Sequence, residues 1–113
     1  MKAVRIHEHG SIDVLMWEEI KSQECPDDKV RVRIKAAALN HLDIWIRKGF
    51  DGISLPMPLI MGSDGAGIIT EIGRDVTNLK TGDEVVIQPN TFCGSCPACQ
   101  SGKENFCQTY GIL

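Results

Sequence analysis

Four cysteines near the end of the chain constrain its fold more than any other feature. They lie in the segment "CGSCPACQSGKENFC", residues 93–107, with the spacing C-x2-C-x2-C-x7-C. Each C-x-x-C turn directs two thiolates at one point, and the seven-residue return is long enough to bring back the fourth. Four thiolates around Zn²⁺ form a closed tetrahedral site without an open position for catalysis. The spacing therefore predicts one structural zinc per chain, in a lobe of residues 91–109, with these ligands: Cys93, Cys96, Cys99 and Cys107.

Two alternative roles for these cysteines stay open. An iron–sulfur cluster also uses C-x2-C-x2-C runs, but its fourth cysteine usually follows after three residues and precedes a proline. Here the last gap is seven residues and the proline follows Cys96. The second alternative is a set of free or oxidised thiols, although disulfide frameworks are typical of secreted chains. The fifth cysteine, Cys25, stands alone before a proline and is interpreted as an incidental thiol.

The composition excludes several classes of function. A chain of 113 residues suffices for one domain, and its formal charge of −3 offers no basic surface for nucleic acid. No apolar run approaches the roughly 20 residues of a membrane helix, and the start lacks the features of a signal peptide. We therefore expect a cytoplasmic protein with neither a nucleic-acid nor a membrane partner.

Hydrophobic patterning predicts a mainly β chain. Apolar and basic residues alternate over 30–35, which is typical of a half-buried strand with Val30, Val32 and Ile34 facing inward. The proline-containing segment 50–59 is predicted as loop, as is everything from residue 91 onward. Further strands are predicted at 2–7, 14–20, 66–73 and 83–89. Many short strands favour a partly open barrel over a doubly wound sheet.

One short helix is predicted over "NHLDIWIRKG", residues 40–49. Asn40 suits its N-cap, Asp43 places a negative charge in its first turn, and Gly49 suits its end. Helical spacing gives the segment an apolar side that is expected to face the core. That side consists of Leu42, Trp45 and Ile46.

The glycine-rich segment "MGSDGAG", residues 61–67, invites interpretation as a phosphate-binding loop. Its spacing, G-x-x-G-x-G, is the reverse of the dinucleotide fingerprint G-x-G-x-x-G. A proline-rich stretch precedes it, and the β-branched "IITEI" follows it where a helix is needed to hold a phosphate. We therefore expect a tight bend with close backbone approach and no cofactor-binding residue in this chain.

Taken in order, these motifs resemble the N-terminal catalytic domain of medium-chain dehydrogenases/reductases. They are "A-x-N-x-x-D" at the helix start, "P-x-x-x-G-S-D-x-x-G", "G-D-E-V" and the four-cysteine lobe. The resemblance covers essentially all of residues 1–113. It implies a GroES-like, partly open β-barrel of the zinc alcohol dehydrogenase and quinone oxidoreductase type, of which this chain is the N-terminal portion.

The chain departs from the zinc alcohol dehydrogenases at their catalytic metal. Asn40 stands where those enzymes have their first ligand, a cysteine, and Ser63-Asp64 stands where they have His-Glu. Leu42 replaces a hydroxyl-bearing residue, and the third ligand would fall beyond Leu113. An amide and a neutral hydroxyl are poor zinc ligands. The resemblance therefore implies an enzyme without a catalytic zinc, closer to the quinone-oxidoreductase-like branch, although many members of that branch lack the cysteine lobe.

For function, the resemblance implies hydride transfer between NAD(P)H and a small-molecule quinone, enone or related carbonyl. Asn40 would donate to the carbonyl oxygen with help from Ser63, while Asp43 and Asp64 would orient neighbouring groups. Each of these residues can also serve the fold alone. Asn40 can simply cap the helix, Asp43 can complement the helix dipole, and Ser63 and Asp64 can be turn residues.

The resemblance also implies that the NAD(P)-binding Rossmann domain lies outside this chain, which alone is expected to be inactive. An incomplete barrel has an exposed edge, from which we expect association into a homo-oligomer. Two alternatives stay open: a zinc alcohol dehydrogenase with unusual catalytic ligands, and a stand-alone zinc-stapled binding module.

Overall fold

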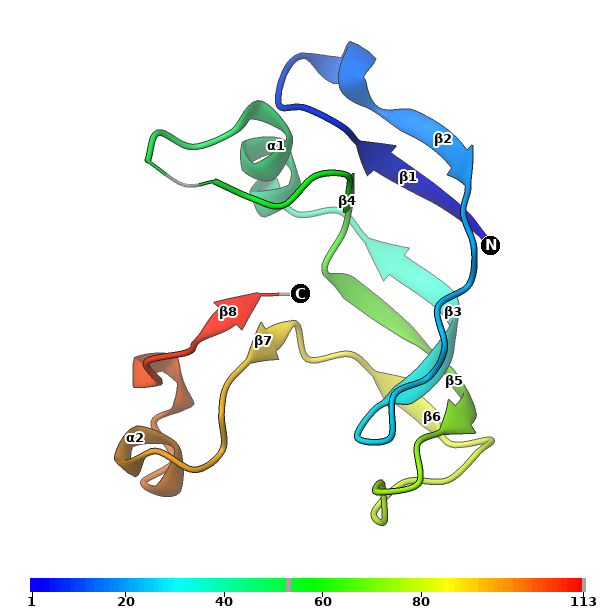
Figure 1. The fold of residues 1–113 in the computed structure, drawn as a ribbon, viewed down its shortest axis with the longest axis vertical. Helices are drawn as coiled ribbons and strands as arrows, with labels where there is room; N and C mark the ends of the chain where they lie inside the picture. Colours follow the sequence, from blue (N-terminus) through cyan, green and yellow to red (C-terminus); the bar gives the residue numbers. More distant parts are fainter. Residues whose placement is uncertain (53, 113) are drawn as a thin grey trace.

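The computed structural model describes residues 1–52 and 54–112 as a set of small antiparallel sheets with short helices (Figure 1). The first sheet has the order β2-β1-β4. Its strands are β1 (Lys2–Ile6), β2 (Met16–Glu19) and β4 (Leu59–Ile60), with the 3-10 turn η1 (Ile12–Val14) between the first two. Strand β4 begins at the last residue of the segment 50–59 predicted as loop, and pairing with β1 makes it a strand.

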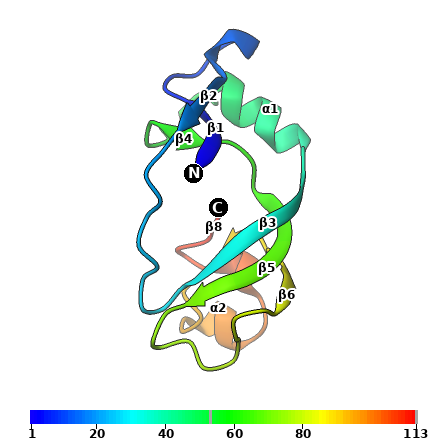
Figure 2. The same cartoon turned by 90° about the vertical axis from the view of Figure 1, so that its right-hand side faces the viewer.

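The second sheet has the order β3-β5-β6 and contains the longest strands. These are β3 (Val30–Ala38) and β5 (Asp64–Ile72), and the shorter β6 (Glu84–Val86) completes the sheet. Figure 2 shows β3 and β5 running side by side along the molecule. Their register, with irregularities along it, ends with Ala38 opposite Asp64. This register brings the end of β3, and the helix that follows, next to the glycine-rich segment.

The predicted helix is confirmed as α1 (His41–Lys48). Asn40 is its extended N-cap residue, and Gly49 ends it with a φ of 88°. The loop before η1 holds the C-terminal end of α1, because the Gly10 N–H donates to the Arg47 carbonyl over 2.9 Å. His9 Nδ1 also lies 2.8 Å from the Ile46 carbonyl oxygen. The N-terminal loop thus fixes the helix that carries the candidate site.

The cysteine-rich segment is not the irregular loop predicted from residue 91 onward. Its first and last residues pair as β7 (Asn90–Thr91) and β8 (Gly111–Ile112). Between them lie a short helix α2 (Pro97–Gln100) and a 3-10 turn η2 (Glu104–Phe106). Pro97 opens α2 at its first position, where the missing N–H costs no hydrogen bond.

The core is small, which corrects two predictions. Its fully buried large side chains are Ile6 and Ile69. Ile34, expected to face inward, is 49% exposed, because the second half of β3, residues 33–38, is exposed along its whole length. Trp45, expected in the core, is also 49% exposed, since it packs against the rings of His41 and Phe50 on the outer side of α1.

In the described part of the chain, no helix has the length and apolar character needed to cross a membrane.

Candidate functional site

The start of α1 and the glycine-rich segment meet through one hydrogen bond. The Asn40 Nδ2 amide donates to Oδ2 of Asp64 over 2.7 Å. The direction of this bond follows from chemistry, because an ionised carboxylate only accepts. A side-chain amide carries two N–H groups, so the bond uses one of them. Because Asn40 is exposed, its amide lies where a bound molecule can reach it.

Asp43 holds the backbone of Asn40 in place. Its Oδ2 accepts from the Asn40 backbone N–H over 2.7 Å, and its own N–H donates to the Asn40 carbonyl over 3.0 Å. The carboxyl side chain is buried, and this bond together with the positive end of α1 offsets the cost of burying a charge. Asn40 is therefore held at its backbone by Asp43 and at its side chain by Asp64. We call these three residues the Asn40 corner.

Ser63, which precedes Asp64 in the chain, lines a cleft of about 570 Å³. The walls of this cleft come from α1, from the segment before β5 and from the region of β8, and most of them are apolar. Residues from the three walls include Leu42 and Ile46, Ile60, Tyr110 and Ile112. Such a cavity, apolar with a few polar groups, is typical of a small-molecule site.

A second cleft of about 750 Å³ contains Asn40 and Asp43. Met61 lines both clefts, so the two are neighbours. The structure thus groups three of the four candidate catalytic residues at one corner, and it places the fourth, Ser63, in the adjoining cleft.

Two glycines of the segment 61–67 have geometric reasons to be glycine. Gly62, next to Ser63, has a φ of 96°, a left-handed conformation that side chains rarely adopt. A Cβ on Gly67 would lie 2.1 Å from the Arg33 carbonyl oxygen of β3. The segment continues directly into β5, so the expectation of a tight bend with close backbone approach is confirmed.

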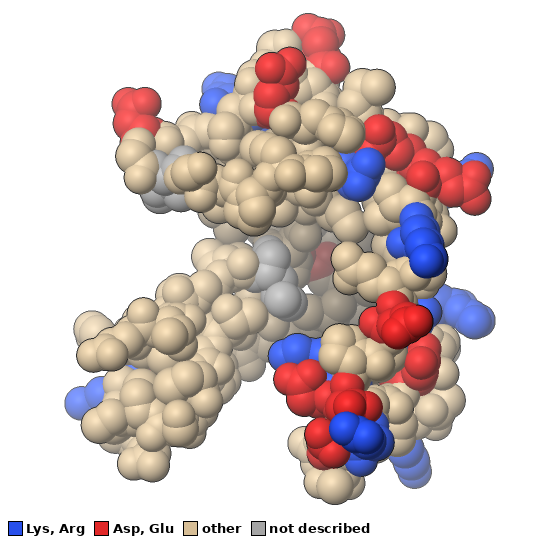
Figure 3. Space-filling view, viewed as in Figure 1, with Lys and Arg blue, Asp and Glu red and all other residues tan. Residues whose placement is uncertain are grey.

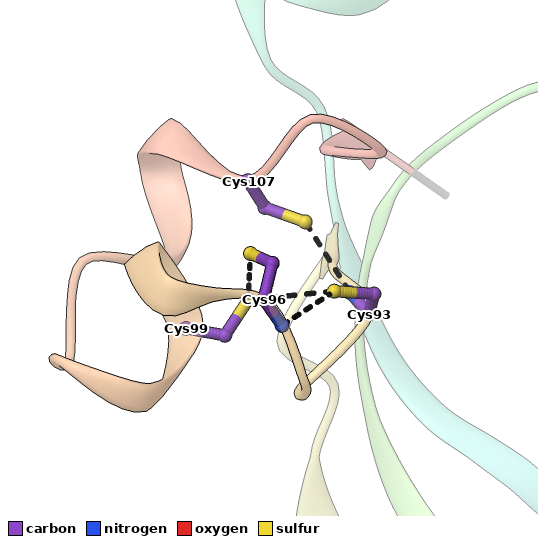
Figure 4. Close-up of side chains that lie close together, drawn as sticks. All are labelled: Cys93, Cys96, Cys99 and Cys107. Carbon is purple, nitrogen blue, oxygen red and sulfur yellow. Dashed lines mark hydrogen bonds between the residues drawn. The ribbon is translucent and has the colours of Figure 1, made fainter.

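The four predicted metal ligands also meet in space (Figure 4). Their sulfur atoms all lie within 4.8 Å of one another. The Sγ atoms of Cys93 and Cys99 are 3.9 Å apart, and those of Cys96 and Cys99 are 3.5 Å apart. Sulfurs at about 2.3 Å from one tetrahedral zinc ion are about 3.8 Å apart. The arrangement therefore fits a single Zn²⁺ bound by four thiolates.

Backbone N–H groups around the cluster point at sulfur. The Cys96 N–H donates to Cys93 Sγ over 3.3 Å, and the Cys93 N–H donates to Cys107 Sγ over 3.4 Å. Hydrogen bonds from the Ser95 backbone and hydroxyl lower the pKa of the Cys93 thiol to about 5. A hydrogen bond from Thr109 lowers the pKa of Cys107, whereas burial raises the pKa of Cys99 to about 12. The surroundings thus favour the thiolate, which is the metal-binding form, at Cys93 and Cys107 and disfavour it at Cys99.

Among residues 1–52 and 54–112, this cluster is the one group of three or more Cys, His, Asp or Glu side chains close enough to hold a metal ion. The Asn40 corner contributes two carboxylates and an amide, and it lacks a thiolate or imidazole. The two polar centres therefore differ in the kind of ligand that they offer.

Comparison with known proteins places these features in a family. Residues 26–112 match the family model of the alcohol dehydrogenase GroES-like domain. The chain belongs to this family. The alcohol dehydrogenase of Schizosaccharomyces pombe is 36% identical over 106 residues, which are 93% of this chain and 30% of that enzyme. These matches confirm the resemblance to zinc-type medium-chain dehydrogenases/reductases.

Solved structures agree with this assignment. A crystal structure of an NAD-dependent alcohol dehydrogenase superposes with a TM-score of 0.93 at 44% identity, covering 100% of this chain and 33% of that one. An Escherichia coli quinone oxidoreductase in complex with NADPH gives a TM-score of 0.71 at 30% identity, covering 76% of this chain and 26% of that one. The predicted GroES-like, mainly β fold is thus confirmed, and the chain spans about a third of the length of the relatives that it matches.

Sequence reasoning missed the partners of two histidines and one wall of the cleft. The Nε2 atom of His7 lies 3.0 Å from Oε1 of Glu18 on the neighbouring strand. His9 contacts the end of α1, and Tyr110 lines the cleft beside Ser63. Each contact joins segments at least 11 residues apart, so local patterns carry no signal for it.

Proposed function

We propose that residues 1–113 are the N-terminal, substrate-side part of an NAD(P)-dependent medium-chain oxidoreductase. The full-length enzyme reduces quinones, enones or related carbonyl compounds. It carries a structural zinc in the lobe 91–109 and works without a catalytic zinc. The observation that carries this proposal is the Asn40–Asp64 hydrogen bond of 2.7 Å. It joins the two positions at which the family resemblance expects a cysteine ligand and a glutamate, and it fills them with an amide and a carboxylate.

The Asn40 corner supplies a positioned donor. With its backbone held by Asp43 and one N–H held by Asp64, Asn40 presents its second N–H to the oxygen of a bound carbonyl group. A nicotinamide cofactor, when bound, supplies the hydride. As negative charge grows on the substrate oxygen, the Asn40 amide stabilises it, in the manner of an oxyanion hole. A conjugated substrate spreads the same charge over its own π-system, which reduces the need for a metal ion.

Ser63 is a second donor within the same region. Its hydroxyl lines the apolar cleft of about 570 Å³, whose walls suit the carbon skeleton of a quinone or enone. Bound there, the substrate lies between the Ser63 hydroxyl and the adjoining Asn40 corner. Removing the apolar walls from water also strengthens both hydrogen bonds.

The structural zinc would be held by the four cysteines, whose sulfur spacing fits one tetrahedral ion. It would fix the lobe without entering the chemistry, since four protein ligands leave no open position. The iron–sulfur and free-thiol alternatives have no observation in their favour among these distances. The family match likewise favours an oxidoreductase over a stand-alone binding module. A cytoplasmic location and a homo-oligomer stay predictions.

The test of this mechanism is Asn40→Ala in the full-length oxidoreductase, assayed for enone reduction with NADH and with NADPH. Loss of one oxyanion donor is expected to lower kcat by about a hundredfold or more. Asn78→Ala is the matched control, because Asn78 is an exposed residue in a distant bend. Unchanged reduction in Asn40→Ala would remove Asn40 from the mechanism.

A further inference from the structure

The region after the last cysteine forms one wall of the cleft beside Ser63. Tyr110, Gly111 and Ile112 line it, facing Leu42 and Ile46 of α1 across the opening. Figure 1 shows β8 emerging from the lobe towards the space between β4 and β7, and Figure 3 shows the molecular surface hollowed between the lobe and the part that contains α1. The cleft thus depends on where the lobe places the end of β8.

Among the described residues, the pairing of β7 with β8 ties this wall to the lobe. Strands β7 and β8 pair over two residues each, Asn90 with Ile112 and Thr91 with Gly111. Their further tie is the Tyr110 hydroxyl, which donates to Asn90 Oδ1 over 2.8 Å. A two-stranded ribbon by itself is marginally stable at best, so the lobe at its base contributes to holding it.

The cysteine cluster closes the loop at the base of this ribbon. Cys93 follows β7 by two residues, and Cys107 precedes Tyr110 by three. The Cys93 N–H donates to Cys107 Sγ over 3.4 Å, and the Tyr110 N–H donates to the Cys107 carbonyl over 3.0 Å. A metal ion that joins the two cysteines removes most of the conformational freedom of the segment between them.

We propose that a metal ion in the four-cysteine cluster holds β8 in place, and with it the Tyr110 wall of the cleft beside Ser63. The lobe is then a metal-dependent clasp on the substrate cleft, so that metal occupancy sets the shape of the cleft. This inference rests on the proposed zinc site. It adds that the ion acts on the cleft, through Cys107 and Tyr110, rather than on the stability of the lobe alone.

Tyr110 lines this wall, so a label at this position reports on it. The full-length protein carrying 3-fluorotyrosine at position 110 alone is loaded with zinc, its zinc content is measured, and the ¹⁹F spectrum is recorded before and after chelation. Amide hydrogen exchange is followed at Gly111 and Ile112, with Ile69 of β5 as the internal reference. We expect chelation to move or broaden the fluorine signal and to lower protection at Gly111 and Ile112 by about tenfold or more, while Ile69 stays protected.

Three outcomes would overturn the clasp. Chelation that removes zinc and leaves the fluorine signal and β8 protection unchanged would show that the wall stands by itself. Equal loss of protection at Ile69 would show that the ion stabilises the whole chain and has no local effect on the cleft. A protein that takes up no zinc would overturn the proposed metal site itself, which the measured zinc content shows separately.

A second variant isolates the tie between the strands. Tyr110→Phe keeps all four cysteines and the ring but loses the hydrogen bond to Asn90. We expect this zinc-loaded variant to keep its zinc and to lose several-fold protection at Gly111, with Phe106→Leu in the exposed η2 turn as the control. Unchanged protection at Gly111 in Tyr110→Phe would contradict the tie.

Discussion

The four-cysteine lobe and the Asn40 corner are both built from polar residues that converge from separate segments, yet they offer opposite chemistry. The lobe gathers four soft thiolates with backbone donors around them. The corner gathers an amide and two carboxylates, each of which accepts a hydrogen bond from Asn40. Figure 3 shows a further contrast, since the arm that contains the lobe carries few charged side chains on the visible face. Similar convergence therefore does not mean a similar ligand, because the donor atoms decide what each place can bind.

The largest effect is expected when one cysteine ligand is removed from the lobe. Cys96→Ser removes one thiolate, and we expect zinc affinity to fall by more than about a hundredfold, since even indirect partners of a metal site are worth 10- to 100-fold. Competition with a chromophoric chelator measures the change. Cys25→Ser is the control, because Cys25 lies far from the cluster in sequence and bonds only to a turn carbonyl among its described contacts. Equal affinity in the two variants would contradict the four-thiolate site.

The second-largest effect is expected in the zinc affinity of the lobe as the pH is lowered. Burial raises the pKa of Cys99 to about 12, so in the metal-free protein its thiol keeps a proton that zinc must displace at neutral pH. Each displaced proton makes affinity rise about tenfold per pH unit, so affinity falls as pH falls. Near pH 5 the lowered pKa of Cys93 is reached as well, and the fall becomes steeper. Zinc affinity that does not change between pH 8 and pH 5 would be inconsistent with thiolate ligands.

A smaller effect is expected at the corner. Asp64→Ala removes the acceptor that orients the Asn40 amide but leaves Asn40 in place, so we expect enone reduction to fall by about tenfold, less than for Asn40→Ala. The effect should appear in kcat more than in KM, because the orientation matters as charge develops. Asp75→Ala, in an exposed turn, is the control. A larger loss in Asp64→Ala than in Asn40→Ala would reverse the assigned roles.

The smallest effect is expected in the cleft. Ser63→Ala keeps the apolar wall and removes one hydroxyl, so a loss of about threefold to tenfold in kcat/KM is expected if its bond to substrate is a modest one. Steady-state kinetics with the matched control Ser54→Ala, an exposed loop residue, measure it. A loss in Ser63→Ala as great as that in Asn40→Ala would make Ser63 the principal donor.

The parts that local chemistry decides could be predicted from the sequence. The cysteine spacing predicted the cluster, the caps predicted the bounds of α1 within a residue, and the glycine pattern predicted the bend before β5. Alternation along β3 predicted an inward Ile34, which is half exposed, because alternation indicates the face of a strand but not what covers it. The contacts of Tyr110 and His9 were not predicted, for a related reason. Their contacts depend on how distant segments pack, which a single sequence does not display.

The most direct test of the central claim is a count of metal ions in the full-length oxidoreductase. Metal analysis of the purified protein should give about one zinc per chain, and a variant with all four cluster cysteines changed to serine should give none. That result would place the zinc in the lobe and leave the Asn40 corner free of metal. Two zinc ions per chain, or one that persists without the four cysteines, would contradict an enzyme that keeps its structural zinc and works without a catalytic one.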